Sequence, residues 1–169
     1  MIEVMVGGLA YDERTKSHVV ILRERDGSRV LPIWIGPAEA SAIMMELAGK
    51  KFQRPLTHDL MATIVRGLRA RVSKIVISDL RDNTFYAHIL LEREKDKEIV
   101  NVDARPSDSI ALALKTNSPI FLSDTLLEGA RDIGLSEKDE KDKTEEERAE
   151  ELRKFLEALS PEDFGKFVP

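Results

Sequence analysis

Two blocks of short apolar runs, separated by segments of helical periodicity, constrain the fold of this chain most. The first block holds three runs rich in β-branched and aromatic residues, at 4–11, 19–22 and 30–35. The second block holds the runs 72–80, 85–91 and 99–103. Polar turns separate the runs, and the Asp-Gly pair of Arg25-Asp26-Gly27-Ser28 is a strong hairpin signal. Each block therefore predicts an antiparallel β-meander.

Apolar residues repeat at helical spacing between and after these blocks. Helices are predicted at about 37–49, from 57 to 67 or 70, from Arg105-Pro106-Ser107-Asp108 onward, and at 124–133, with a short strand at 119–122 before the last. Thr57 is predicted to cap the second helix. We expect an α/β (α+β-like) fold with a mixed, largely antiparallel sheet built from two β-meanders with intervening helices, plus a C-terminal amphipathic helix.

The last part of the chain differs in composition from the rest. We expect one domain at 1–134 and, at 135–169, a charged linker followed by the amphipathic helix, whose apolar residues are Leu152, Phe155, Leu156 and Leu159. The tail carries 12 acidic and 7 basic residues, so the whole net charge of −5 lies in it and the body is formally neutral.

Composition excludes several classes of protein. Cysteine is absent, so there is neither a disulfide framework nor a thiolate metal site. No apolar run approaches the roughly 18 residues that span a bilayer, and no secretory signal is present, so we expect a cytoplasmic protein without a membrane partner. Phosphate-loop, dinucleotide-binding and serine-hydrolase motifs are also missing.

One stretch of the body is basic. Between Lys50 and Lys74 the chain has seven basic residues and one acid, Asp59. Such a patch attracts polyanions, and we predict that it contacts a nucleic-acid backbone through Lys50, Lys51, Arg66, Arg69 and Arg71. The alternative is a solvated helix face with compensating acids nearby.

Two helix entrances look alike, and each begins with Arg-Pro. A helix N-terminus presents free amide donors, and a preceding arginine adds a fork suited to phosphate. Placed side by side, the entrances would form an anion cradle with the phosphate-binding candidates Arg54, Thr57, Arg105 and Ser107. The alternative is ordinary capping, with the arginines paired to neighbouring acids.

A phosphodiesterase must also activate water, usually with carboxylates that hold divalent metal. We predict His58, Asp59 and Asp108 as catalytic residues, with His58 as general base, and Asp103 and Asp108 as ligands of Mg²⁺ or Mn²⁺; no organic cofactor is expected. Acids near element ends also arise from capping and turn chemistry, and His58 also suits a capping role.

Four separated motifs resemble the bifunctional nuclease domain family of bacteria and plants: LPIWIGPAEA at 31–40, RPLTHDL at 54–60, DNTFYA at 82–87 and VDARPSDSIALA at 102–113. The resemblance spans roughly residues 1–130. It implies an α/β fold with mixed or antiparallel sheets, a homo-oligomer, and the DNase and RNase activity described for some plant members.

Together these observations predict a nuclease that hydrolyses DNA or RNA phosphodiester bonds with low sequence specificity, assisted by a divalent metal. The alternative is a non-catalytic oligomeric module that binds an anion or a partner. A common nuclease signature, a strand-borne acid followed two residues later by Lys after an upstream Asp, occurs on none of the expected strands. Its absence, the neutral body and the acidic tail favour the alternative.

Overall fold

A single eight-stranded sheet organises the molecule in the computed structural model, which describes residues 1–126, the backbone of 127–128 and 131–132, and seven positions between 144 and 158. The strands are β1 (Ile2–Asp12), β2 (Ser17–Glu24), β3 (Arg29–Ile35), β4 (Ala70–Arg81), β5 (Thr84–Arg93), β6 (Ile99–Ala104), β7 (Ile120–Leu122) and β8 (Arg131–Asp132). Their order is β6-β5-β4-β7-β1-β2-β3-β8, and only the β4–β7 pair is parallel. The predicted fold class, with its two meanders, is confirmed.

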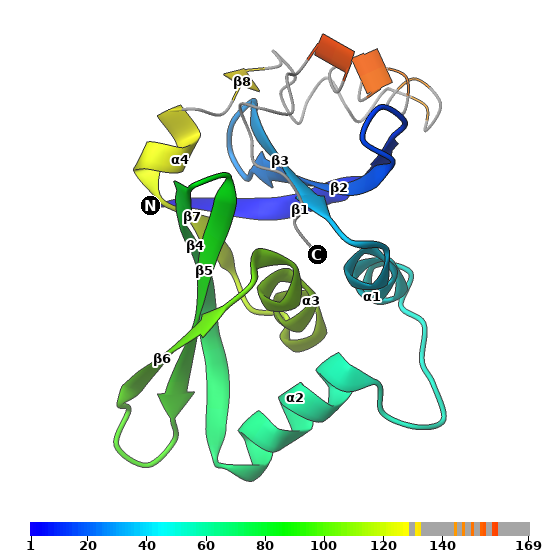
Figure 1. The fold of residues 1–169 in the computed structure, drawn as a ribbon. Coiled ribbons are helices and arrows are strands. Elements are labelled where there is room, and N and C mark those ends of the chain that lie inside the picture. The colour runs from blue at the N-terminus through cyan, green and yellow to red at the C-terminus, as the bar shows by residue number, and fades with distance from the viewer. Residues whose placement is uncertain are drawn as a thin grey trace.

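Within residues 1–128, four helices connect and cover the strands: α1 (Pro37–Leu47), α2 (Thr57–Gly67), α3 (Pro106–Thr116) and α4 (Asp124–Glu128). The strands of the two meanders run in different directions, and α3 lies in the corner between them (Figure 1). Both α1 and α2 pack against α3. The helices thus bring residues from three distant segments to one side of the sheet.

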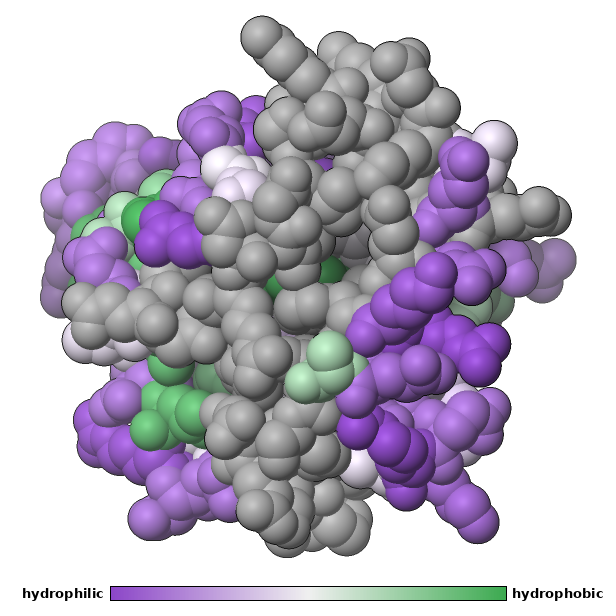
Figure 2. Space-filling view, turned by 90° about the horizontal axis from the view of Figure 1, so that it is seen from above, coloured by the Kyte–Doolittle hydropathy of each residue, from purple (hydrophilic) through white to green (hydrophobic). Residues whose placement is uncertain are grey.

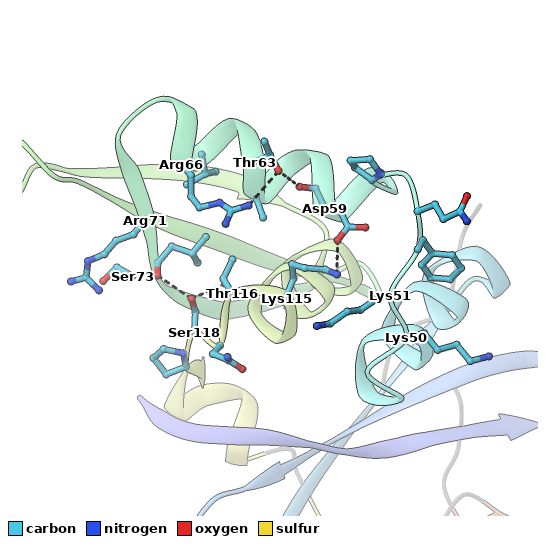
Figure 3. A pocket seen from close by; sticks show the side chains of 18 residues that line it. Lys50, Lys51, Asp59, Thr63, Arg66, Arg71, Ser73, Lys115, Thr116 and Ser118 are labelled. Atoms are coloured by element: carbon cyan, nitrogen blue, oxygen red, sulfur yellow. Dashed lines mark hydrogen bonds and ion pairs between the residues drawn. The ribbon is translucent and has the colours of Figure 1, made fainter.

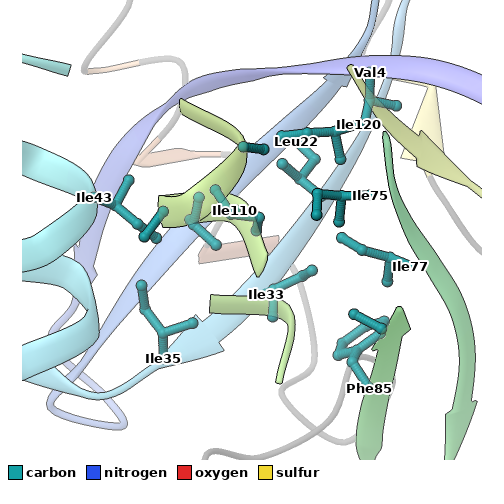
Figure 4. Close-up of a cluster of buried hydrophobic side chains, with 14 of the residues drawn as sticks. Val4, Leu22, Ile33, Ile35, Ile43, Ile75, Ile77, Phe85, Ile110 and Ile120 are labelled. Carbon is teal, nitrogen blue, oxygen red and sulfur yellow. The ribbon is translucent and has the colours of Figure 1, made fainter. Parts of the chain in front are cut away.

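The core fills the space between α3 and the two meanders (Figure 4). Ile110 of α3 is fully buried among side chains of both meanders, including Leu22 and Ile75. Burial of each such aliphatic side chain contributes about 1.5–3 kcal/mol. Residues 30–35 of β3 are all buried, whereas buried and more exposed positions largely alternate along β5, as expected for a strand with one covered face. The core therefore fixes α3, on which much of the candidate site is built.

Local signals set most element boundaries. Prolines stand at the first position of α1 and α3, where the missing N–H costs no hydrogen bond. Asp82 and Asn83 join β4 to β5 with positive φ angles of 47° and 60°, the conformation of a type I′ hairpin turn.

Two sequence-based expectations were wrong. The helix predicted at 124–133 ends at Glu128, because residues 131–132 pair as β8 with Arg29 and Val30 of β3. Thr57 does not cap α2; the Asp59 carboxylate accepts the Leu56 N–H at 2.9 Å instead, because the helix begins at Thr57 itself. The predicted boundary at 134/135 and most of the predicted C-terminal helix lie outside the described residues.

Seen from the side of the first meander, the described surface is mainly hydrophilic, with small separate apolar patches (Figure 2). Among the described residues, no helix has both the length and the apolar character needed to cross a membrane.

Candidate functional site

The two Arg-Pro helix entrances meet where α2 and α3 begin. His58 Nε2 lies 3.4 Å from Asp108 Oδ1, and the Arg105 Nε–H donates to Asp108 Oδ2 at 2.7 Å. Arg105 also donates to Glu39 of α1 at 2.9 Å. The His58 Nε2 atom is buried and forms no hydrogen bond of good geometry, but it lies against Asp108. Three helices thus join through one chain of polar and charged side chains.

The environment of Asp108 strongly favours its ionised form. His58 first, and the Arg105 guanidinium after it, lower the pKa of Asp108 to about 2, against partial burial, which raises it. Asp108 is therefore a carboxylate at neutral pH and can hold the His58 ring in one orientation.

A second ion-pair cluster ties the same helices together nearby. Lys115 Nζ lies 2.5 Å from Glu46 of α1 and 2.6 Å from Asp59 of α2. Lys115 and the Leu56 N–H lower the pKa of Asp59. Burial alone would lower the pKa of Lys115, but the two carboxylates raise it above its usual value. Both oxygens of Asp59 are therefore engaged in structural contacts.

A hollow of about 580 Å³ separates α1 from the two helix entrances. Its walls hold four carboxylates, those of Glu39, Glu46, Asp59 and Asp108. Each of them pairs with Arg105 or Lys115. We call this region the paired junction. Because Arg105 already pairs with Glu39 and Asp108, the geometry agrees with the capping alternative more closely than with an open anion cradle.

A larger hollow of about 820 Å³ lies on the other side of Asp59, between α2, the start of β4 and the end of α3 (Figure 3). Its lining has five cationic side chains and one carboxylate: Lys50, Lys51, Arg66, Arg71, Lys115 and Asp59. We call it the basic groove. Lys51 and Arg66 reach into it from different walls (Figure 3). It adjoins the paired junction, since Pro55 and Asp59 line both.

The cations of the basic groove differ in their partners. Arg71 pairs with Glu92 at 2.6 Å, and among the described residues Arg66 donates to the Thr63 hydroxyl alone, at 3.4 Å. Lys50 and Lys51 form no ion pair with another described residue. The groove therefore carries positive charge that the described part of the protein does not neutralise.

The remaining predicted residues lie in varied places. Arg54 and Thr57 are exposed beside the start of α2, whereas the Ser107 side chain is buried. Arg69 is exposed in the turn before β4 and does not line the groove. Asp103 is exposed on β6, opposite His88 of β5. The structure thus brings His58, Arg105 and Asp108 into one chain of contacts, whereas Arg54, Arg69 and Asp103 lie outside both hollows.

The residues predicted to hold Mg²⁺ or Mn²⁺ do not fit a resident metal site in this arrangement. Both Asp108 oxygens face nitrogen donors of His58 and Arg105. Over the residues that the structure describes, no group of three or more histidine and acidic side chains is arranged to hold a metal ion. A divalent ion at Asp108 would have to displace the arginine.

Sequence reasoning missed two residues of this region, Lys115 and Phe52. Lys115 lies two helical turns after Asp108 on α3, so a shared helix face was a signal for it. Phe52 lines the basic groove with 48% of its surface exposed. An aromatic residue inside a basic segment was the corresponding signal for it.

Comparison with known proteins shows which family model and which proteins this chain is similar to. The bifunctional nuclease domain model matches residues 20–133. The chain is 39% identical to the uncharacterized protein MT1877 of Mycobacterium tuberculosis (strain CDC 1551 / Oshkosh) over 164 residues, 96% of this chain and 97% of that protein. It is 23% identical to bifunctional nuclease 1 of Oryza sativa subsp. indica over 105 residues, 61% of this chain and 32% of the rice protein. The bifunctional nuclease of Oryza minuta matches to the same extent.

Proposed function

Because the chain belongs to the bifunctional nuclease domain family, we propose that it is a cytoplasmic enzyme that hydrolyses phosphodiester bonds of DNA or RNA with little sequence preference. One observation carries the proposal: the contact between His58 and Asp108 lies next to a groove in which Lys50 and Lys51 form no ion pair with another described residue. A base held beside an anion-binding groove is the minimum that phosphodiester hydrolysis requires.

In this proposal His58 is the general base. Its Nε2 faces Asp108, so Nδ1 is the nitrogen left to accept a proton from the attacking water. The water oxygen forms the new bond to phosphorus, the bond to the leaving oxygen breaks, and the proton on Nδ1 returns to that oxygen. Asp108 orients the ring and stabilises the imidazolium while it carries the proton.

Other side chains position the substrate. Arg105 lies at the junction with part of its guanidinium exposed, and we assign it to the phosphate. Asp59 acts through Lys115, whose position it fixes, and not on the reacting atoms. Mg²⁺ or Mn²⁺ dependence belongs to the proposal as well, but we assign no step to the ion because the four carboxylates of the paired junction already have cationic partners.

The test is hydrolysis of fluorescently labelled single- and double-stranded DNA and RNA by the wild-type protein, with Mg²⁺, Mn²⁺ or EDTA. Purified His58→Ala is assayed in parallel, and His18→Ala serves as a control for contaminating nuclease. We expect cleavage by the wild type and by His18→Ala, with a loss of about 10²-fold or more in His58→Ala. Equal background cleavage in all three proteins would reject the proposal.

A second candidate function is a binding module that does not catalyse. It is favoured by the complete pairing of the four carboxylates in the paired junction. The same assay separates the two, because a binding module retains nucleic acid without cleaving it under any metal condition.

We also propose that the protein forms a homo-oligomer through β6. This strand lies at the edge of the sheet and exposes Ile99, Val100 and Val102. It contains neither lysine nor proline, the residues that commonly protect an edge from pairing. Light scattering should show a dimer or larger assembly that Val100→Lys disrupts, and a wild-type monomer at micromolar concentration would contradict this.

A further inference from the structure

We propose that the basic groove binds a single strand of nucleic acid rather than a duplex, with one base stacked on Phe52. This inference rests on the proposed function because it concerns the same site. It adds which form of nucleic acid binds there.

Unmatched charge is the first support. Several basic side chains elsewhere in the body have acidic partners: Arg25 pairs with Glu3, and Arg29 with Glu24. At the groove, Lys50 and Lys51 lack an ion pair with any described residue. A polyanion that binds beside such cations releases its counterions, and this release favours binding.

Phe52 is the second support. It follows Lys51 directly in the chain, lines the groove and leaves 48% of its surface exposed. Stacking of a base on such a ring removes apolar surface from water, and the neighbouring cation can hold the adjoining phosphate. The low aromatic content of the whole chain, 5%, argues against a platform for several bases but leaves room for one.

The shape of the groove is the third support. Proteins read a duplex with an element that protrudes into its grooves. Here Lys51 and Arg66 reach into a hollow from different walls (Figure 3). The exposed amide side chains of Gln53 and Asn117 line the same hollow. A flexible strand can bend into such a hollow and place a base against the ring, whereas the bases of a duplex are already stacked on each other.

Binding is measured by fluorescence anisotropy with labelled oligothymidylate of about 12 nucleotides, a length within the site sizes of single-strand grooves, and with a duplex of equal length. EDTA is present throughout, so that metal-dependent cleavage is suppressed. The variants are Phe52→Ala and Phe52→Trp, and Tyr11→Ala is the matched control because Tyr11 is also 48% exposed but does not line the groove.

We expect the single strand to bind more tightly than the duplex, and Phe52→Ala to bind it about fivefold or more weakly, with Tyr11→Ala unchanged. Phe52→Trp should keep the affinity, and the single strand should quench its new emission above the constant signal of buried Trp34. Equal single-strand affinity in Phe52→Ala and wild type, or tighter binding of the duplex, would overturn the inference.

The outcome is independent of catalysis. If the nuclease assay shows no hydrolysis while Phe52→Ala still weakens single-strand binding, the proposed function fails and this inference stands. If the wild type cleaves nucleic acid and Phe52→Ala binds normally, only this inference fails.

Discussion

The paired junction and the basic groove lie on two sides of Asp59 and use charged side chains in opposite ways. At the junction, Arg105 and Lys115 each pair with two carboxylates, so every one of the four carboxylates has a cationic partner within the protein. In the groove, Lys50 and Lys51 have no such partner among the described residues. The comparison indicates that the paired junction fixes the positions of the helices and of His58, whereas the basic groove keeps cations that can bind an anion from outside.

The largest effect that would sharpen this comparison is on catalysis. Asp108→Asn keeps the shape of the side chain but removes the charge that faces His58, so kcat should fall by about 10²-fold or more. Asp59→Asn is the matched control, because its partner is Lys115 and not the base. Cleavage kinetics measure both variants. An equal loss of kcat in the two would show that Asp108 has no role toward His58 that Asp59 lacks.

The next effect is on stability. Lys115→Met keeps most of the aliphatic stem but leaves Glu46 and Asp59 near each other without their shared cation. We expect the free energy of unfolding to fall by about 1–3 kcal/mol in urea denaturation. Lys95→Met, at an exposed lysine with no ion pair to a described residue, should change it by less than about 0.5 kcal/mol. Unchanged stability in Lys115→Met would show that the junction does not hold the helices together.

Acid should weaken the junction. The pKa of Asp108 is lowered to about 2 in the folded protein, so its stabilising contribution is complete above the unfolded value near pH 4 and is lost as the pH falls toward 2. Since the side chain is partly exposed, we expect a loss of about 1–2 kcal/mol over this range.

Unfolding experiments at several pH values between 4 and 2 test this prediction. Asp108→Asn should lose less stability than wild type over the same interval, while Asp59, whose pKa is also lowered, contributes equally to both proteins. Parallel acid profiles for the two proteins would contradict the assignment.

The smallest expected effect is the change in binding when one cation of the basic groove is removed. Lys51→Gln should weaken binding of single-stranded DNA a few-fold and reduce the slope of log K against log salt by about 0.7, the value for one phosphate contact on a single strand. Lys16→Gln is the control, because Lys16 is an exposed lysine of the β1–β2 turn, outside the groove. Equal slopes for the two variants would mean that the groove does not follow the nucleic-acid backbone.

Much of the fold could be predicted from local sequence. The polar turns and the prolines at 37 and 106 act within a few residues, and the structure follows them. The end of α4 could not be predicted this way. Residues 131–132 pair with Arg29 and Val30, about 100 residues earlier, and no local pattern encodes such a partner.

Less of the site could be predicted. The repeated Arg-Pro signal suggested that two helix entrances form one site, and the structure brings His58 and Asp108 within 3.4 Å. The sequence could not show that Arg105 pairs with Glu39, because that acid belongs to another helix. The role of Lys115 was hidden for the same reason, since both of its partners are distant in the chain.

The most direct test of the central claim is steady-state hydrolysis of a labelled single strand by wild type, His58→Ala and the double variant Lys51→Gln with Arg66→Gln. The account predicts that the first variant loses kcat with little change in KM, and that the double variant raises KM with kcat nearly kept. If both variants change the same constant, or if the wild type does not cleave, the division between a catalytic junction and a binding groove is wrong.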